Sequence, residues 1–212
     1  MAIEKHGRTS GSIGNIVHYT LRGKNVMRLK PGIKNNPRTA KQQNHRAKIR
    51  ESSKFIRSIN SFIKIGYQAT PLDYAANEAR QFIIKNCFIE TPDGVKLNFP
   101  SILVSRGELK KPENYSMTVD GTTATITWKK PEKRDYTDGT DKVMIALYSD
   151  TPPEGSSWLK NSVAFRSDGT ATIEIPAHEL PIHAWMFFYN AEKATGESKK
   201  KISDSVYLGE IA

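Results

Sequence analysis

The sequence predicts an α+β protein built from three parts, and three observations lead to this prediction. A basic stretch with alternating β-branched residues comes first and is typical of a β-hairpin. A stretch with a 3.6-residue apolar period follows and indicates a pair of helices. Short alternating segments separated by turn residues fill the rest and indicate a β-sandwich. The expected parts are a basic hairpin and linker arm (1–38), an αα-hairpin (39–90) and a β-sandwich domain (91–212).

The expected hairpin of the arm occupies residues 11–32, with a turn at residues 22–25. Successive side chains of a strand point to opposite faces. On the returning strand Val26, Arg28 and Lys30 therefore share one face, whereas Met27 and Leu29 lie on the other. One face of the hairpin is expected to be basic. The polar residues 34–39 that follow read as an extended linker, because the residue before a proline avoids the helical region.

The helical pair begins at Thr39, where the apolar period changes to 3.6 residues. Ile49, Ile56 and Ile63 repeat every seven residues, and basic side chains fall on the opposite arc. A second helix is expected after Thr70, a suitable N-cap that is followed by a proline. This helix is expected to end near residues 86–90.

Beyond a turn signal at residues 91–94 the chain reads as all-β. Asp120-Gly121 separates two alternating runs and is the clearest hairpin turn, while Trp128 is expected to point inward. The pattern resembles a fibronectin type III or immunoglobulin-like sandwich. The expected strands are 102–105, 115–119, 122–128, 142–149, 162–165, 170–175, 184–190 and 203–208.

The charge distribution is uneven along the chain. The whole chain has 32 basic and 22 acidic residues, a formal net charge of +10. Residues 1–57 hold 14 basic and two acidic residues, a net charge of +12, and the remaining 155 residues carry a net charge of −2. All of the excess positive charge therefore belongs to the arm and the first helix, which indicates a partner-binding surface.

Residues that would carry catalysis or bind a metal do not form a recognisable pattern. None of the five histidines forms a His-x-x-x-His pair or lies near a cysteine or carboxylate at a metal-ligand spacing. The single cysteine, Cys87, lies on the apolar stripe of the second helix and is expected to be buried and inert. We therefore expect no catalytic residues, no cofactor and no metal, and the protein is predicted not to be an enzyme.

Several motifs resemble those of a family of uncharacterised proteins common in Bacteroidetes genomes. Its N-terminal signature runs approximately Gly-x-x-Gly-x-Val, then Asn-Pro-(Arg/Lys)-Thr-x-x-Gln. The matching stretches here are Gly11–Val17, Arg22–Arg28, Asn36–Gln43 with Arg46, Val104–Leu109, the Trp128 strand and Ser203–Gly209. The resemblance covers almost the whole chain and implies a domain of unknown function, so it transfers no activity, cofactor or catalytic residue to this chain. It also implies a cytoplasmic protein or one encoded by a phage or mobile element.

Two functions fit these observations. The first is a non-enzymatic structural or assembly protein, similar to a virion connector, whose basic arm contacts a neighbouring protein subunit or nucleic acid within an oligomer or larger assembly. The second is a discrete nucleic-acid-binding protein that uses the arm and the basic helix face on DNA or RNA. An acidic protein surface and a polyanion satisfy the charge equally well. The expected contact residues are Arg22, Lys24, Arg28, Lys30, Lys34, Arg38, Lys41, Arg46, Arg50, Lys54 and Arg57.

The location expected from the sequence is the cytoplasm, or the virion if a phage encodes the protein. No secretion signal is recognisable, and no stretch approaches eighteen apolar residues. We therefore expect no membrane partner.

Overall fold

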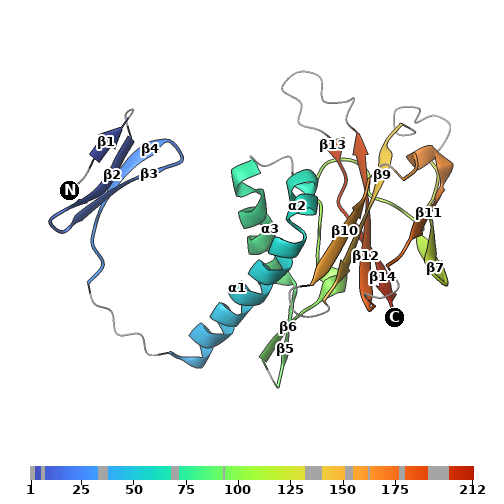
Figure 1. The fold of residues 1–212 in the computed structure, drawn as a ribbon, viewed down its shortest axis with the longest axis horizontal. Helices are drawn as coiled ribbons and strands as arrows, with labels where there is room; N and C mark the ends of the chain where they lie inside the picture. The colour runs from blue at the N-terminus through green and yellow to red at the C-terminus, as the bar shows by residue number, and fades with distance from the viewer. Residues whose placement is uncertain are drawn as a thin grey trace. The chain divides into compact units, whose positions relative to one another are not determined.

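The protein has a mixed α+β fold, as predicted (Figure 1). The computed structural model describes residues 3–5, 8–32, 38–67, 72–92, 94–131, 140–150, 155–161, 163–176, 180–190 and 201–212. The chain divides into two compact units, Met1–Thr39 and Ala40–Ala212. The helices and the C-terminal strands thus belong to one unit.

The first unit is a four-stranded antiparallel sheet with the order β1-β2-β3-β4. Its strands are β1 (Ile3–Lys5), β2 (Arg8–Ile13), β3 (Ile16–Leu21) and β4 (Lys24–Leu29). We call this unit the N-terminal sheet. The predicted hairpin, residues 11–32, corresponds to β3 and β4, except that residues 11–13 belong to β2, because the chain turns at residues 14–15. The strands β1 and β2 were not predicted, because Thr9–Ser12 contains only small and polar residues.

A two-residue turn fixes the register of β3 against β4. Arg22 and Gly23 both have positive φ angles, 51° and 76°. This is the backbone of a type I′ turn, whose twist matches that of the flanking strands. Glycine adopts this conformation without steric cost, so its place at position 23 explains why the hairpin turns here.

The helical region contains α1 (Ala40–Ser58), α2 (Asn60–Gly66) and α3 (Leu72–Asn86). The sequence predicted one helix where α1 and α2 lie, but the structure separates them at Ile59. The Ser58 carbonyl accepts a hydrogen bond from Ser157 Oγ (2.6 Å), and Phe62 N donates to Ile59 O (2.9 Å), a tighter turn than an α-helix has. The expected N-cap Thr70 lies outside the described residues, and α3 ends where predicted.

A small hairpin and a 3-10 turn follow the helices. The hairpin consists of β5 (Phe88–Thr91) and β6 (Gly94–Leu97), and the 3-10 turn, η1, spans Phe99–Ser101. The sequence predicted only the turn of this hairpin, because its strands are four residues long and lack a clear alternation.

The remaining strands form two antiparallel sheets. One sheet has the order β11-β8-β7, and the other has the order β10-β9-β12, with both β13 and β14 pairing with β12. The first sheet contains β7 (Ser116–Asp120), β8 (Thr123–Thr127) and β11 (Thr170–Glu174). The second contains β9 (Lys142–Ser149), β10 (Ser156–Lys160), β12 (Ile182–Asn190), β13 (Lys201–Ile202) and β14 (Val206–Ile211). A 3-10 turn, η2 (Arg166–Asp168), precedes β11.

Two expected strands are absent from the described part of the chain. Residues 102–105 do not pair with a neighbouring strand. Tyr67 Oη donates to Leu103 O (3.1 Å), Trp185 Nε1 donates to Ile102 O (3.1 Å), and the backbone N of Ser205 donates to Ser105 O (3.2 Å). Within 163–165 only Phe165 forms a bridge, with Lys142. The strand beside β9 is β10, which the sequence did not predict.

The core of residues 40–212 has two parts, one on each face of the sheet that contains β9 and β12. Met144, Ala146 and Tyr148 of β9 pack with the helices, around residues such as Phe55. Their neighbours along β9, such as Ile145, pack with the buried residues of β8 and β11. The second unit therefore has three layers: helices, a five-stranded sheet and a three-stranded sheet. Both faces of β12 are apolar, because its residues alternate between the same two parts of the core.

Candidate interaction surface

The two faces of the N-terminal sheet differ in charge. Residues directly opposite in an antiparallel pair share a face. Ile13 faces Ile16, which faces Leu29, and His18 lies opposite both Gly11 and Met27. With the pair Thr20 and Asn25, they form what we call the apolar face. None of its side chains that the structure describes is charged.

The apolar face is open to solvent. Its four large apolar side chains are 41–72% exposed, with Leu29 at 72% and Met27 at 69%. Isolated exposed apolar residues are ordinary, whereas adjacent ones on one face of a sheet indicate an interaction site. The sequence predicted that Met27 and Leu29 lie opposite the basic residues, and the register confirms this.

The opposite face of the N-terminal sheet carries Lys24 and Arg28, and we call it the basic face. The Arg28 guanidinium lies 5.7 Å from the centre of the Tyr19 ring. Arg22 lies in the β3–β4 turn, and Lys30 follows β4, where its backbone N donates to Asn15 O (2.7 Å). All four basic residues are exposed. The basic side chains therefore do not border the apolar face on the same side of the sheet.

The other predicted contact residues lie around α1, except Lys34, which is outside the described residues. Arg38 precedes α1, and Lys41, Arg46, Arg50 and Arg57 are exposed on it. On α1 the exposed arginines lie opposite the buried Phe55 and Ile56, as the sequence predicted. The ten described residues are therefore divided between the N-terminal sheet, the segment before α1 and α1 itself.

Part of the positive charge of α1 is neutralised within the molecule. Lys54 Nζ lies 3.3 Å from Asp150 Oδ1, Lys48 Nζ lies 3.4 Å from Glu90 Oε1, and Arg50 Nε lies 3.1 Å from Glu51 Oε1. Such exposed pairs contribute little stability, but they lower the net charge that a partner meets. Arg46 and Arg57 have no ion pair with any described residue. The sequence could not distinguish these two arginines from Lys54.

The first turns of α1 are exposed at every position. Residues 40–46 contain Lys41, Gln42, Gln43, Asn44, His45 and Arg46, and none of them is buried. A helix that is polar on all sides is surrounded by solvent or bridges to another molecule. The end of α1 at Ser58 is, in contrast, packed on the core.

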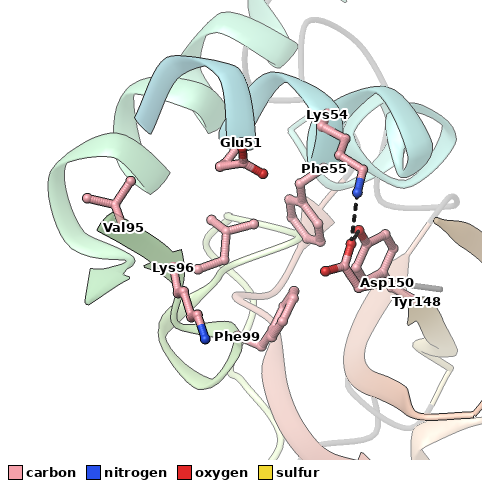
Figure 2. A pocket seen from close by; sticks show the side chains of 9 residues that line it. Glu51, Lys54, Phe55, Val95, Lys96, Phe99, Tyr148 and Asp150 are labelled. Carbon is pink, nitrogen blue, oxygen red and sulfur yellow. Dashed lines mark hydrogen bonds and ion pairs between the residues drawn. The ribbon is translucent and has the colours of Figure 1, made fainter. Parts of the chain in front are cut away.

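A pocket of about 320 Å³ lies between α1, β6 and the end of β9 (Figure 2). Phe55, Phe99 and Tyr148 supply its apolar wall, and the ring centres of Phe55 and Tyr148 are 4.8 Å apart. Val95 and Leu97 of β6 add to this wall, and two carboxylates and two ammonium groups complete the lining. Figure 2 shows Lys54 reaching Asp150 beside Tyr148. Tyr148 Oη also donates to Asp150 Oδ1 (3.0 Å). The formal charges of the lining side chains therefore cancel.

Burial shifts the pKa of several groups in the second unit. Burial, reinforced by Asp150, raises the pKa of Tyr148 above its usual value of 10, so the phenol stays protonated. Burial lowers the pKa of His183, while Glu210 and Asp150 act in the opposite direction. Burial raises the pKa of the Cys87 thiol to about 11. The predicted burial of Cys87 is confirmed, and at neutral pH its thiol is not a nucleophile.

A buried ion pair joins the start of β9 to η2 and the end of β12. Arg166 Nη1 lies 3.2 Å from Asp141 Oδ2, and Asn190 Nδ2 donates to Asp141 Oδ1 (2.6 Å). The Arg166 guanidinium also lies 4.6 Å from the centre of the Phe188 ring. Sequence reasoning missed this group, because Asp141, Arg166 and Asn190 are 24 or more positions apart and no local pattern relates them.

Among the described residues, no group of three or more histidine, cysteine, aspartate or glutamate side chains is placed to hold a metal ion. None of the described helices is long and apolar enough to cross a membrane.

The comparison with protein families matches nearly the whole chain. A family model described as "Family of unknown function (DUF6266)" covers residues 8–209. The chain belongs to this family. Membership of DUF6266 confirms the resemblance to a family of unknown function that the motifs indicated, and the match extends from β2 to β14 across both units. The comparison with curated proteins found no match for this DUF6266 chain.

Proposed function

We propose that this DUF6266 protein is a non-enzymatic assembly protein whose N-terminal sheet binds a neighbouring protein subunit. The observation that carries the proposal is the apolar face, where adjacent side chains such as Met27 and Leu29 are mostly exposed. A sheet with one apolar face normally buries that face against another layer. Contact with a protein subunit would remove this apolar surface from water and so stabilise the assembly.

The distribution of charge favours a protein over a polyanion or a membrane on the apolar face. A polyanion is held by cations, and Lys24 and Arg28 lie on the opposite face. At an anionic membrane surface, basic residues flank the apolar residues and contact the headgroups. Here the same two cations would point away from the membrane. An uncharged protein surface is the partner that fits.

The C-terminal sheets add support of a general kind. In immunoglobulin constant domains the first, second and fifth strands share a sheet, and the third, sixth and seventh form the other. Here β7, β8 and β11, the first, second and fifth strands of this region, share one sheet. The other sheet contains β9, β12 and β14, and β10 pairs with β9 in it. We propose a fibronectin type III or immunoglobulin-like sandwich, an architecture that recurs in domains that bind other proteins.

The test of the proposal is the size of the native particle in the organism that encodes the protein. We expect the wild-type chain to sediment in the lysate as a particle larger than a 23.8 kDa monomer. Leu29→Asp should shift it toward the monomer, because the new carboxylate would have to be buried in the contact. Leu29 is 72% exposed, so the fold should tolerate the change.

The matched control for this experiment is Leu21→Asp. Leu21 is 54% exposed and lies opposite Lys24, on the basic face. The control should sediment like the wild type. A monomeric wild-type chain, or equal dissociation by both variants, would contradict the assembly proposal.

A second function, nucleic-acid binding through α1, is favoured by one observation. Arg46 and Arg57 are exposed and have no ion pair with described residues, and the turns around Arg46 are polar on all sides. Binding of random duplex DNA by the full chain should weaken steeply with salt, and Arg46→Glu with Arg57→Glu should reduce the salt slope by about two. Lys48→Glu with Lys54→Glu, at paired positions, is the control with the same charge change. Fluorescence anisotropy measures both, and a salt slope near zero for the wild type would exclude this function.

A further inference from the structure

We propose that the apolar face of the N-terminal sheet is a self-association surface, covered in a dimer by the same face of a second copy of this chain. The inference rests on the proposed function and names the neighbouring subunit. Three observations support the inference. The side chains of the apolar face form rows, none of its described side chains is charged, and the basic residues Lys24 and Arg28 lie on the opposite face.

The side chains of the apolar face form parallel rows across the sheet. Ile13, Ile16 and Leu29 form one row, and the row of His18 and Met27 lies beside it. Gly11 ends the second row and has no side chain, so this row is lower at β2 than at β4. A protruding Met27 from a second copy could occupy the lower part of the row, which makes the face complementary to itself.

The charge of the unit excludes the partners that are recognised by charge. Residues 1–39 contain eight basic residues and one acidic residue, a net charge of +7. An acidic surface would therefore be attracted to the basic face, where Lys24 and Arg28 lie. The apolar face requires an uncharged apolar partner. A second copy provides such a surface, and two-fold dimers of this kind are the commonest protein oligomers.

Self-association of two such units has a characteristic salt dependence. The apolar contact brings no described charges together, but each unit carries a net charge of +7. The long-range repulsion between them is screened as the ionic strength rises. Dimerisation should therefore strengthen with salt, whereas binding to a polyanion weakens with salt. The two kinds of binding are distinguished by the sign of this dependence.

Sedimentation velocity of the purified full-length protein, from low to high micromolar concentration, tests the proposal. We expect the wild-type protein to change reversibly from a monomer to a dimer as its concentration rises. Met27→Glu should weaken the dimer at least tenfold in Kd, since the carboxylate would be buried opposite apolar side chains. Leu21→Glu, on the basic face, should leave the Kd within about twofold.

A charge-swap pair separates a lost contact from a lost fold. One variant carries Ile16→Glu and Met27→Glu, and the other carries Ile16→Lys and Met27→Lys. Each variant alone should be monomeric, because like charges would meet. An equimolar mixture should form a heterodimer through opposite charges. Formation of the heterodimer would show that both variants are folded and that the two faces meet.

Three outcomes would overturn the proposal. The first is a wild-type protein that stays monomeric at all concentrations and salt levels. The second is a dimer that Leu21→Glu weakens as much as Met27→Glu does. The third is a charge-swap mixture that stays monomeric. If the purified protein is monomeric while the native particle still depends on Leu29, the partner on this face is a different protein. In that case self-association is wrong and the proposed assembly function stands.

Discussion

His183 on β12 shows how burial determines the charge of a single side chain. It is 7% exposed and stacks on Phe99 with 3.8 Å between ring centres. Its Nδ1 lies 2.9 Å from Tyr207 Oη. Burial lowers the pKa of His183 below its usual value of 6.5, so the ring is neutral in the folded protein at neutral pH.

This shift predicts a loss of stability in mild acid. The unfolded chain binds a proton at His183 near pH 6.5, whereas the folded chain binds it only at lower pH. The free energy of unfolding should therefore fall as the pH decreases below about 6.5 toward the folded pKa. In His183→Gln this part of the decrease should be absent, and His45→Gln, at an exposed position on α1, is the control. Thermal unfolding from pH 7.5 to 5 measures the effect, and equal pH slopes for wild type and His183→Gln would contradict it.

Met27 and Leu29 show what alternation on one strand can predict about individual residues. The two-residue period of a strand assigned them to the face opposite Arg28, and the register of β4 confirms this assignment. Their exposure could not be predicted in the same way. The sequence pattern of an apolar face is the same whether or not another layer of the protein covers that face.

At the scale of elements, the strongest local patterns predicted their elements well. The strand β9 has the predicted bounds, and α3 ends as predicted at Asn86. The alternation in β8 and β11 is confirmed by the burial of every second residue, such as Ala171 and Ile173. In these elements one face or stripe is buried, so the sequence repeats with the period of the structure.

Elements held by distant contacts were missed. The strand β10 has no fully buried residue, and its position depends on pairing with β9 and on the bond from Ser157 to Ser58. Residues 101–109 pass so close to β13 that a Cβ at Gly107 would overlap the carbonyl oxygen of Ile202. Such close approaches join residues about one hundred positions apart, and no local pattern indicates them.

The buried pair of Asp141 and Arg166 predicts a large change in stability at the same scale. Asp141→Ala leaves the Arg166 guanidinium, whose side chain is 6% exposed, without its buried counter-charge. The free energy of unfolding should fall by about 3–5 kcal/mol. Urea unfolding measures this change. Glu90→Ala, which removes an exposed pair with Lys48, should cost at most about 1 kcal/mol and is the control.

The outcome that would contradict this prediction is an equal, small effect of both substitutions. A double variant tests whether the loss of the buried counter-charge causes the fall in stability. Asp141→Leu combined with Arg166→Met removes both charges, so it should recover much of the stability that Asp141→Ala loses.

At the scale of the whole molecule, each of the two units carries part of the basic charge. In the N-terminal sheet, Lys24 and Arg28 lie on the face opposite Met27 and Leu29, and on α1 the exposed arginines lie opposite Phe55 and Ile56. The sequence predicted the total excess of charge near the N-terminus. It did not predict that Lys48 and Lys54 would be paired with Glu90 and Asp150, because these acids are 42 and 96 positions away. The exposed charge of α1 is therefore smaller than the sequence indicated.

The sequence by itself determined the α+β class, the β3–β4 hairpin, the end of α3 and the placement of Met27 and Leu29 on the face of β4 opposite Arg28. Each of these depends on the period of neighbouring residues or on a short turn. The tertiary structure alone decided that the helices share a core with the β9–β12 sheet, that Asp141 and Arg166 are buried together, and that the apolar face is exposed. These features depend on contacts between distant segments, and the free energy of burial depends on which surfaces meet.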